Sequence, residues 1–511
     1  MWHGGAFMRL PAAVAAAPCV AVFTVLVTAC ASGVVDEARP RTTTTTSRAT
    51  TTTSGASPVG PLVWHDCDEG ECATLSVPRD HDKPDGDQVE LAVARGSQAD
   101  PEARIGSLLV NPGGPGADGT EWAEYFASLF PNEVTDRFDV VAWDPRGSGD
   151  SAPVDCGDRL DYLFEPDSAP DDPAEQEALE TAAARFAAEC EARSGDWLAN
   201  ISSQDTVRDM DLLRQALGDE QLTYVGFSYG TYLGALYAQA YPDRVRALIL
   251  DGAVDPSVPA EDVGIEQAQG FDRALQAFLD DCAADDDCAF HHDGDPRGGL
   301  EALRARTERG EIRADDRRVL GPTHLDLALA SPLYEGAPAY DDLAEALRDA
   351  ERGDPSALLD EFDVYVGRSS DGTYDAEWPA FLAISCIDVP QLSVTEMREA
   401  QARATIASPD FGAANTGLGY PCSFWPVPAV TATTGPVRAP GAAPIMVIGT
   451  TGDPATPVEW SESLARQLGS GRLVVVEGST HTSLLDGPRC LEDLAIRYLV
   501  DLEPPPEGAR C

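Results

Sequence analysis

The sequence predicts an α/β protein built on a doubly wound, mostly parallel sheet, with a mainly helical domain inserted late in the chain. Two observations predict the sheet: short apolar runs that each end at Gly, Asp or Asn, and helical patterns that lie between them. A third predicts the insertion, because residues 256–430 separate two of these runs by far more than an ordinary connection contains.

The first expected strand, Val89–Ala94, alternates apolar and polar residues as a strand with one wet face does. The later runs are denser in apolar residues, which is typical of central parallel strands. They are Leu108–Val110, Phe138–Trp143, Leu222–Val225, Ala247–Leu250, Ile445–Ile448 and Leu473–Val476. Among the helical patterns, Thr206–Leu217 closes on Gly218. Functional residues are expected just after the strands, because ligands bind at the carboxyl ends of such sheets.

The N-terminal residues 1–30 are typical of a lipoprotein-type signal peptide. An apolar stretch, Leu10–Ala29, ends in Val27-Thr28-Ala29-Cys30. This ending resembles a bacterial lipobox, in which Cys30 would carry the lipid; the alternative is an ordinary secretory cleavage site beside a passive cysteine. Residues 31–57 form a Thr- and Ser-rich linker. We therefore expect an exported protein, anchored by lipid on the outer face of the cell membrane or secreted, with no spanning helix.

The charge and the cysteines narrow the function classes further. With 36 Lys and Arg against 86 Asp and Glu, the net charge of −50 excludes a nucleic-acid partner held by phosphate contacts. Ten of the twelve cysteines lie beyond the signal segment, and an even set in an exported chain favours disulfides. Neighbours in sequence suggest the pairs, but the connectivity stays open. No Cys-x2-Cys pair or His cluster accompanies them, so no metal or other cofactor is expected.

A nucleophile elbow stands at one strand end. Gly226-Phe227-Ser228-Tyr229-Gly230 follows the strand Leu222–Val225 and precedes the helical run Leu233–Ala238, which is the strand-turn-helix context that the pattern Gly-x-Ser-x-Gly requires. The glycines are expected because strand and helix approach each other closely there. Ser228 is the candidate nucleophile.

A serine nucleophile needs a histidine base and a carboxylate that orients it. Of seven histidines, only His481 follows a terminal core strand. His3 lies in the signal segment, His65 and His81 before the sheet, His291 and His292 in an acidic loop, and His324 at a helix start where capping or a surface position is expected.

Asp453 is the best candidate for the acid, because it follows the strand Ile445–Ile448 in the chain order Ser, Asp, His. Its alternative role is that of a turn residue capping the helix Val458–Leu468. Glu459 and Asp486 are poorer rivals, since neither directly follows a strand.

An acyl-transfer site also needs N–H donors for an oxyanion. One is expected from Tyr229, directly after the nucleophile. The other is expected from Gly113 or Gly114 in the loop Asn111–Gly116, where glycines allow the backbone to approach a substrate. The alternative is a Gly/Pro turn without a ligand. A phosphate cradle is disfavoured because no Walker lysine follows.

With these residues in place, the chain resembles the secreted bacterial tripeptidyl aminopeptidases of the α/β-hydrolase superfamily, which are related to proline iminopeptidases and have a TAP-like C-terminal region. The matching stretches are Asn111–Gly116, Trp143–Gly149, Gly226–Gly230, Leu250–Pro256, Gly452–Pro454 with His481, Ala383–Asp388, Cys422–Pro426 and the spacing of Cys490 and Cys511. The resemblance implies a serine exopeptidase that releases short peptides, often of three residues, from the free N-terminus of a peptide or protein. It leaves the oligomeric state open.

The resemblance also implies a division of the chain into a first hydrolase segment, 58–255, a helical cap, 256–430, and a C-terminal hydrolase segment, 431–511. An aminopeptidase must bind an ammonium group, and Asp388 in the cap is the candidate carboxylate, with a solvated or structural role as its alternative. Two other functions stay open: a carboxylesterase or lipase that uses the same residues on esters, and a binding protein that kept only the scaffold.

Overall fold

The computed structural model describes residues 59–68, 70–430 and 435–511. The predicted signal peptide and linker and Cys30 lie outside the described residues, so all three assignments, including the lipidation of Cys30, stay predictions. Within the described ranges, none of the helices combines the length and the apolar character that crossing a membrane requires.

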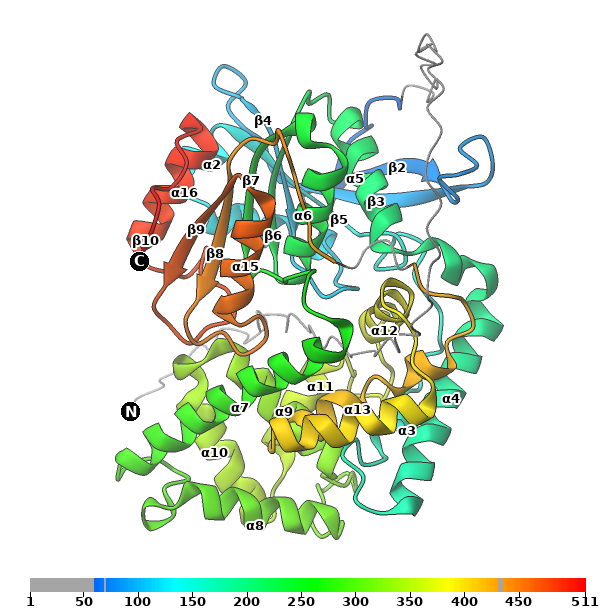
Figure 1. Ribbon diagram of the computed structural model, residues 1–511, viewed down its shortest axis with the longest axis vertical. Helices are drawn as coiled ribbons and strands as arrows, with labels where there is room; N and C mark the ends of the chain where they lie inside the picture. The colour runs from blue at the N-terminus through cyan, green and yellow to red at the C-terminus, as the bar shows by residue number, and fades with distance from the viewer. Residues whose placement is uncertain (1–58, 69, 431–434) are drawn as a thin grey trace, which may run out of the picture.

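One sheet of ten strands runs through the molecule (Figure 1). The strands are β1 (His65–Cys67), β2 (Gly70–Pro78), β3 (Gln88–Ser97), β4 (Gly106–Asn111), β5 (Phe138–Trp143), β6 (Leu222–Phe227), β7 (Val245–Asp251), β8 (Ile445–Thr450), β9 (Gly471–Val476) and β10 (Ala509–Arg510). Their order is β1-β2-β3-β5-β4-β6-β7-β8-β9-β10. The pairs from β1 to β5 are antiparallel, and all pairs from β5–β4 onward are parallel. The predicted mostly parallel sheet is confirmed.

Helices cover both faces of the sheet because its central strands are apolar on both sides. On one face, α5 (Ser203–Ala216), α6 (Tyr229–Ala240) and α15 (Val458–Leu468) pack on side chains such as Leu109 and Val447. On the other, α1 (Ala123–Leu129), α2 (Asn132–Thr135) and α16 (Arg489–Asp501) pack on alternate residues of the same strands, such as Leu108 and Ile448. The alternation along each strand thus builds two cores around one sheet.

The cap is helical and lies beyond the carboxyl ends of the parallel strands (Figure 1). Its helices are α7 (Ala260–Ala284), η4 (His292–Gly294), α8 (Pro296–Glu308), α9 (Pro322–Glu335), η5 (Ala337–Ala339), α10 (Tyr340–Glu351), α11 (Ser356–Tyr365), α12 (Glu377–Asp388), α13 (Val394–Ala407), α14 (Gly412–Gly417) and η6 (Tyr420–Phe424). The remaining helices are η1 (Thr120–Trp122), α3 (Asp161–Phe164), α4 (Pro173–Ser194), η2 (Gly195–Asn200) and η3 (Pro242–Arg244).

An earlier segment of the chain joins this cap. The helix α4 packs along η6, and its Glu180 forms an ion pair with Arg398 of α13. Just before α4, the backbone N–H of Ser168 donates to Thr323 of α9 over 2.8 Å. Residues of the first hydrolase segment therefore help to build the layer that covers the sheet.

Five disulfides close local loops, and each joins the neighbours that the sequence suggested. They are Cys67–Cys72, Cys156–Cys190, Cys282–Cys288, Cys386–Cys422 and Cys490–Cys511. Together they use all ten cysteines beyond the signal segment.

Two expectations from the sequence were wrong. The sheet begins earlier than predicted, because β1 and β2 form a hairpin closed by Cys67–Cys72. His65 lies within β1, and His81 lies in the turn between β2 and β3, so neither precedes the sheet. His324 does not cap α9, and its side chain is half-buried rather than fully exposed. Its ring packs 4.5 Å from that of Phe362, and burial lowers the pKa of His324 to about 4.

Candidate active site

Ser228 lies at the sharp turn between β6 and α6, with φ 51° and ψ −123°. Such a backbone is strained for a residue with a side chain and is characteristic of functional sites. A Cβ at Gly226 would lie 2.4 Å from the carbonyl oxygen of Gly230, and one at Gly230 would lie 2.7 Å from Oδ1 of Asn111. The glycines on either side of the serine are therefore required by close packing, as the sequence predicts.

His481 and Asp453 are brought together from the loops after β9 and β8. Nδ1 of His481 lies 2.8 Å from Oδ1 of Asp453, and both residues are buried. An ionised carboxylate only accepts, so Nδ1 carries the proton in this bond and Nε2 is left as the acceptor.

The carboxylate of Asp453 is itself held in place. Its Oδ1 accepts from the backbone N–H groups of Ala455 and Thr456, and its Oδ2 accepts from the hydroxyl of Thr456 over 2.7 Å. The helix α15 starts after Pro457 without a side-chain cap. Asp453 therefore orients the histidine and the turn but does not cap α15.

Neither Oγ of Ser228 nor Nε2 of His481 has a hydrogen-bond partner among the described residues. Both are shielded from solvent. A hydroxyl and an imidazole acceptor of this kind are the pair between which a serine hydrolase transfers a proton, and in free enzymes the bond between them is often long.

Asp251, the last residue of β7, connects the serine turn to the histidine loop. Its carbonyl oxygen accepts from the backbone N–H of Ser228 over 2.9 Å. Its Oδ2 accepts from the N–H groups of Ser483 and Leu484, two and three residues after His481. The side chain is fully buried, and this burial raises the pKa of Asp251 to about 6. One residue thus holds both loops at the same edge of the sheet.

The predicted oxyanion loop lies against the serine turn. A Cβ at Gly113 would be 2.7 Å from the carbonyl oxygen of Phe227, 3.1 Å from Cβ of Ser228 and 3.4 Å from the nitrogen of Tyr229. Gly113 has φ 114° and donates its N–H to Oδ1 of Asn111 over 3.1 Å. Gly114 follows at φ 99°. The two segments predicted to supply N–H donors are therefore neighbours.

Buried carboxyl groups gather beside this loop. Burial, with Asp144 and Glu121 nearby, raises the pKa of Asp118 to about 7. Burial and the neighbours Asp375 and Asp118 raise the pKa of Glu377 to about 8. Gly116 connects this acidic group to the loop, since a Cβ there would lie 2.7 Å from the carbonyl oxygen of Glu377.

The ring of Tyr334 lies between His481 and a residue that lines a pocket in the cap. Tyr334 of α9 contacts the imidazole ring and also the ring of Phe271, with centroids 5.2 Å apart in each case. Phe271 lines the pocket together with Tyr365 and Asp326, whose pKa is raised to about 6 by burial. The cap therefore lies directly over the histidine side of the edge.

The structure places Asp388 at the C-terminal end of α12, with only 1% of its surface exposed. Its Oδ1 accepts from the backbone N–H of Ser203 over 3.0 Å, and its Oδ2 accepts from the hydroxyl of the same serine. Its predicted role as an ammonium ligand stays a prediction.

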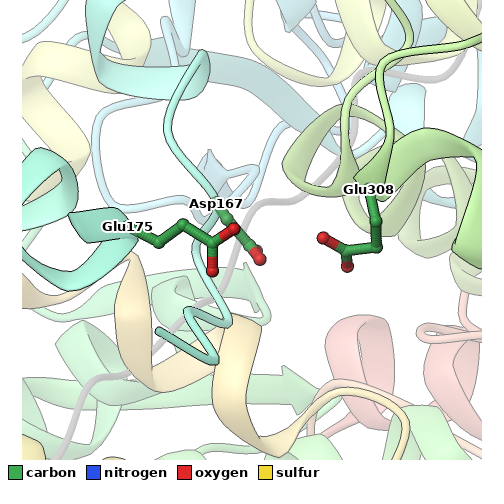
Figure 2. A group of neighbouring side chains, drawn as sticks. All are labelled: Asp167, Glu175 and Glu308. Atoms are coloured by element: carbon green, nitrogen blue, oxygen red, sulfur yellow. The ribbon is translucent and has the colours of Figure 1, made fainter. Parts of the chain in front are cut away.

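Another acidic group lies in the cap region. The carboxylates of Asp167, Glu175 and Glu308 point toward one space, with oxygens within 4.8 Å of one another (Figure 2). Asp167 already accepts from the N–H of Ala169, and Glu308 is exposed. Exposed acidic groups of this kind are common without an ion, and we assign no metal to them.

Several residues of the edge escaped the sequence analysis. Asp251 had a usable signal, since an aspartate at the end of a buried strand faces the same edge as the serine. Thr456 also had a usable signal, because the bond of Asp453 to the N–H of Ala455, two residues on, is an Asx turn, and Thr456 follows directly. Tyr334 and Ser203 gave no local signal, because their contacts arise only when the cap packs on the sheet.

Comparison with known protein families agrees with this geometry. A family model described as "alpha/beta hydrolase fold" matches residues 106–293, and one described as "TAP-like protein" matches residues 408–511. The chain belongs to the α/β-hydrolase family, with a TAP-like C-terminal region.

Three curated relatives refine this placement. The chain is 35% identical over 462 residues to serine protease Hip1 of Mycobacterium tuberculosis, covering 86% of this chain and 87% of that protein. It is 35% identical over 487 residues to carboxylesterase B of the same species, covering 90% and 92%. It is 31% identical over 473 residues to tripeptidyl aminopeptidase of Streptomyces lividans, covering 86% and 84%. The predicted membership among relatives of the tripeptidyl aminopeptidases is confirmed.

Proposed function

We propose that this protein is an exported serine exopeptidase that releases short peptides, of three residues, from free peptide or protein N-termini. The observation that carries the proposal is the buried pair of His481 and Asp453 at the same sheet edge as the strained Ser228. Relatives named serine protease and tripeptidyl aminopeptidase support a peptide substrate. The five disulfides support an oxidising compartment.

In the proposed mechanism, Oγ of Ser228 attacks the carbonyl carbon of the scissile amide while its proton passes to Nε2 of His481. Asp453 stabilises the resulting imidazolium through Nδ1. The negative oxygen of the tetrahedral intermediate accepts from the N–H of Tyr229 and from that of Gly113 or Gly114.

The intermediate collapses when the C–N bond breaks and His481 returns its proton to the leaving amine. The released peptide is then held as an ester on Ser228. A water molecule, deprotonated by His481, attacks this ester, and the proton returns to Oγ of Ser228 when the C–O bond breaks. No group beyond these side chains is needed to balance the reaction.

Recognition of a free N-terminus needs negative charge near the serine. Burial and mutual repulsion raise the pKa of Asp118 to about 7 and that of Glu377 to about 8, and a cationic group bound beside the oxyanion loop would favour their ionised forms. Asp388 is the ligand candidate from the sequence.

The second candidate function is ester hydrolysis. The relative named carboxylesterase B covers slightly more of this chain than the proteases do. The same serine, histidine and aspartate can cleave an ester, which needs no ammonium site.

Hydrolysis of a chromogenic tripeptide amide separates the two functions. The full chain should cleave the amide with a free N-terminus and leave the acetylated amide intact, and Ser228→Ala should cleave neither. A short-chain ester serves as the comparison substrate. Turnover of the ester alone would reject the exopeptidase proposal and favour the second function.

A further inference from the structure

The cap helix α12 contacts both segments that are predicted to supply the oxyanion donors. At its N-terminal end, Gly116 of the loop packs on the helix backbone. A Cβ at Gly116 would lie 2.7 Å from the carbonyl oxygen of Glu377, 2.8 Å from the nitrogen of Phe381 and 3.1 Å from Cβ of Ala380. The loop that carries Gly113 therefore lies directly against the cap.

At the C-terminal end of α12, Asp388 contacts the start of α5, which lies beside the start of α6 after the nucleophile. Ser203, the first residue of α5, donates both its backbone N–H and its hydroxyl to the carboxylate of Asp388. The hydroxyl of Ser203 also bonds to the phenol of Tyr229, the first residue of α6. The phenol of Tyr229 also stabilises the ionised form of Asp388 by a hydrogen bond, so Asp388, Ser203 and Tyr229 form one connected polar group.

The group formed by Asp388, Ser203 and Tyr229 is buried although it contains a carboxyl group. Asp388, Ser203 and Tyr229 are at most 4% exposed, and the disulfide Cys386–Cys422 ties the same end of α12 to η6. Burial raises the pKa of Asp388 to about 7, with Asp205 of α5 adding repulsion and the donors Ser203 and Tyr229 opposing the rise. A buried carboxylate is costly unless donors satisfy it, and here the core helices α5 and α6 supply them.

We propose that Asp388 is a positioning residue for the oxyanion hole, which fixes Tyr229 together with Ser203 so that the cap completes the site. This inference rests on the proposed hydrolase function. It gives Asp388 a part in acyl transfer to any substrate, amide or ester. The sequence analysis instead predicts that Asp388 binds the ammonium group. Loss of a positioning residue should lower kcat on amide and ester alike, whereas loss of an ammonium ligand should raise KM for the free amide alone.

The test compares Asp388→Asn and Tyr229→Phe with the wild type on the free tripeptide amide and on a short-chain ester. Asparagine cannot accept through both oxygens, and phenylalanine removes only the phenol oxygen. We expect kcat to fall about 10-fold on both substrates, less than the roughly 100-fold loss on removing an oxyanion donor outright. KM should stay within about twofold, because substrate contacts are unchanged.

The double variant gives the sharpest readout. If Asp388 acts through Tyr229, the combined loss in kcat should equal that of one single variant, since both break the same connection. Losses that multiply would overturn the proposal. So would a rise in KM confined to the free amide, with the kcat for the ester unchanged, which would make Asp388 an ammonium ligand.

Two controls keep the result interpretable. Asp219→Asn alters another carboxyl group that accepts a backbone N–H, that of Ser107, at the opposite end of β4, and it should leave kcat unchanged. If Asp388→Asn does not fold, Tyr229→Phe alone must still show the loss in kcat. If the wild type cleaves only the ester, the exopeptidase proposal fails, and the ester kcat still decides the role of Asp388.

Discussion

The ring of Tyr334, on the cap helix α9, lies edge-on to the imidazole of His481 with ring centroids 5.2 Å apart. The backbone N–H of His481 donates to the carbonyl oxygen of Tyr334 over 2.9 Å. Two residues further, Gly336 at φ 67° leaves no space for a side chain against Ser479. The cap thus holds the histidine loop through both its backbone and a ring contact.

Removing this ring should loosen the imidazole without unfolding the sheet. We expect Tyr334→Ala to lower kcat by about 10-fold, because the ring contact that limits rotation of His481 is lost while the backbone bond remains. Tyr334→Phe keeps the ring and should retain most of the activity. Steady-state kinetics of both variants check this, and equal losses would show that the hydroxyl, not the ring, matters.

Asp453 should matter far more for kcat than Glu459, the next acid along the chain. Asp453→Asn places an amide opposite Nδ1 of His481 and favours the wrong tautomer, so kcat should fall by roughly 10³- to 10⁴-fold. Glu459→Gln changes an exposed acid six residues further along and should leave kcat unchanged. A large loss in Glu459→Gln together with an active Asp453→Asn would transfer the orienting role to Glu459.

The oxyanion loop should tolerate no side chain at Gly113. Gly113→Ala places a methyl group against Phe227 and Ser228 in a left-handed conformation, so we expect a loss in kcat of at least about 100-fold. Gly195→Ala is the matched control, because Gly195 also has a positive φ but has open space around it. Circular dichroism separates folding from activity, and a fully active Gly113→Ala would remove this loop from the mechanism.

The protein should be more stable at mildly acidic than at mildly alkaline pH. Burial raises the folded-state pKa of Asp118 and Asp388 to about 7 and that of Glu377 to about 8, above their ordinary values. A carboxyl group whose folded-state pKa is raised contributes its full stability below its unfolded-state pKa, near 4. That contribution is lost as pH rises through the folded-state pKa. We expect Tm to fall by about 5 °C between pH 5 and pH 8.

Thermal unfolding across this range is the measurement, with Glu377→Gln as the comparison. The variant cannot ionise at this position, so its Tm should fall less over the same interval. A wild-type Tm that rises toward pH 8 would contradict the account of these buried carboxyl groups.

Much of the fold could be predicted because its signals are local. The central strands are runs of apolar residues, and the run Phe138–Trp143 agrees with β5 residue for residue. The expected helix after Asp453 agrees in the same way with α15. The elbow was recognisable because Gly226 and Gly230 are required by sterics that act within a few residues. The close spacing within each disulfide pair made neighbours the natural partners.

The rest depends on contacts between distant segments, for which a single sequence carries no pattern. Tyr334 contacts His481 only because α9 packs on the loop after β9. In that contact, Ala337 bonds to Ser479, which is 142 residues further along the chain. Asp388 could be singled out as a carboxylate, but its partner Ser203 is 185 residues distant. The hairpin of β1 and β2 escaped because its first strand is short and exposed.

The central claim is that Ser228 is acylated by the peptide that is released from the N-terminus. Rapid quenching of the enzyme with a free tripeptide chromogenic amide, followed by mass spectrometry of the digested protein, tests it most directly. We expect the mass of the tripeptidyl group on the peptide that contains Ser228, and none with the acetylated substrate or in Ser228→Ala. Turnover of the amide with no mass added at Ser228, or retained turnover in Ser228→Ala, would contradict the account.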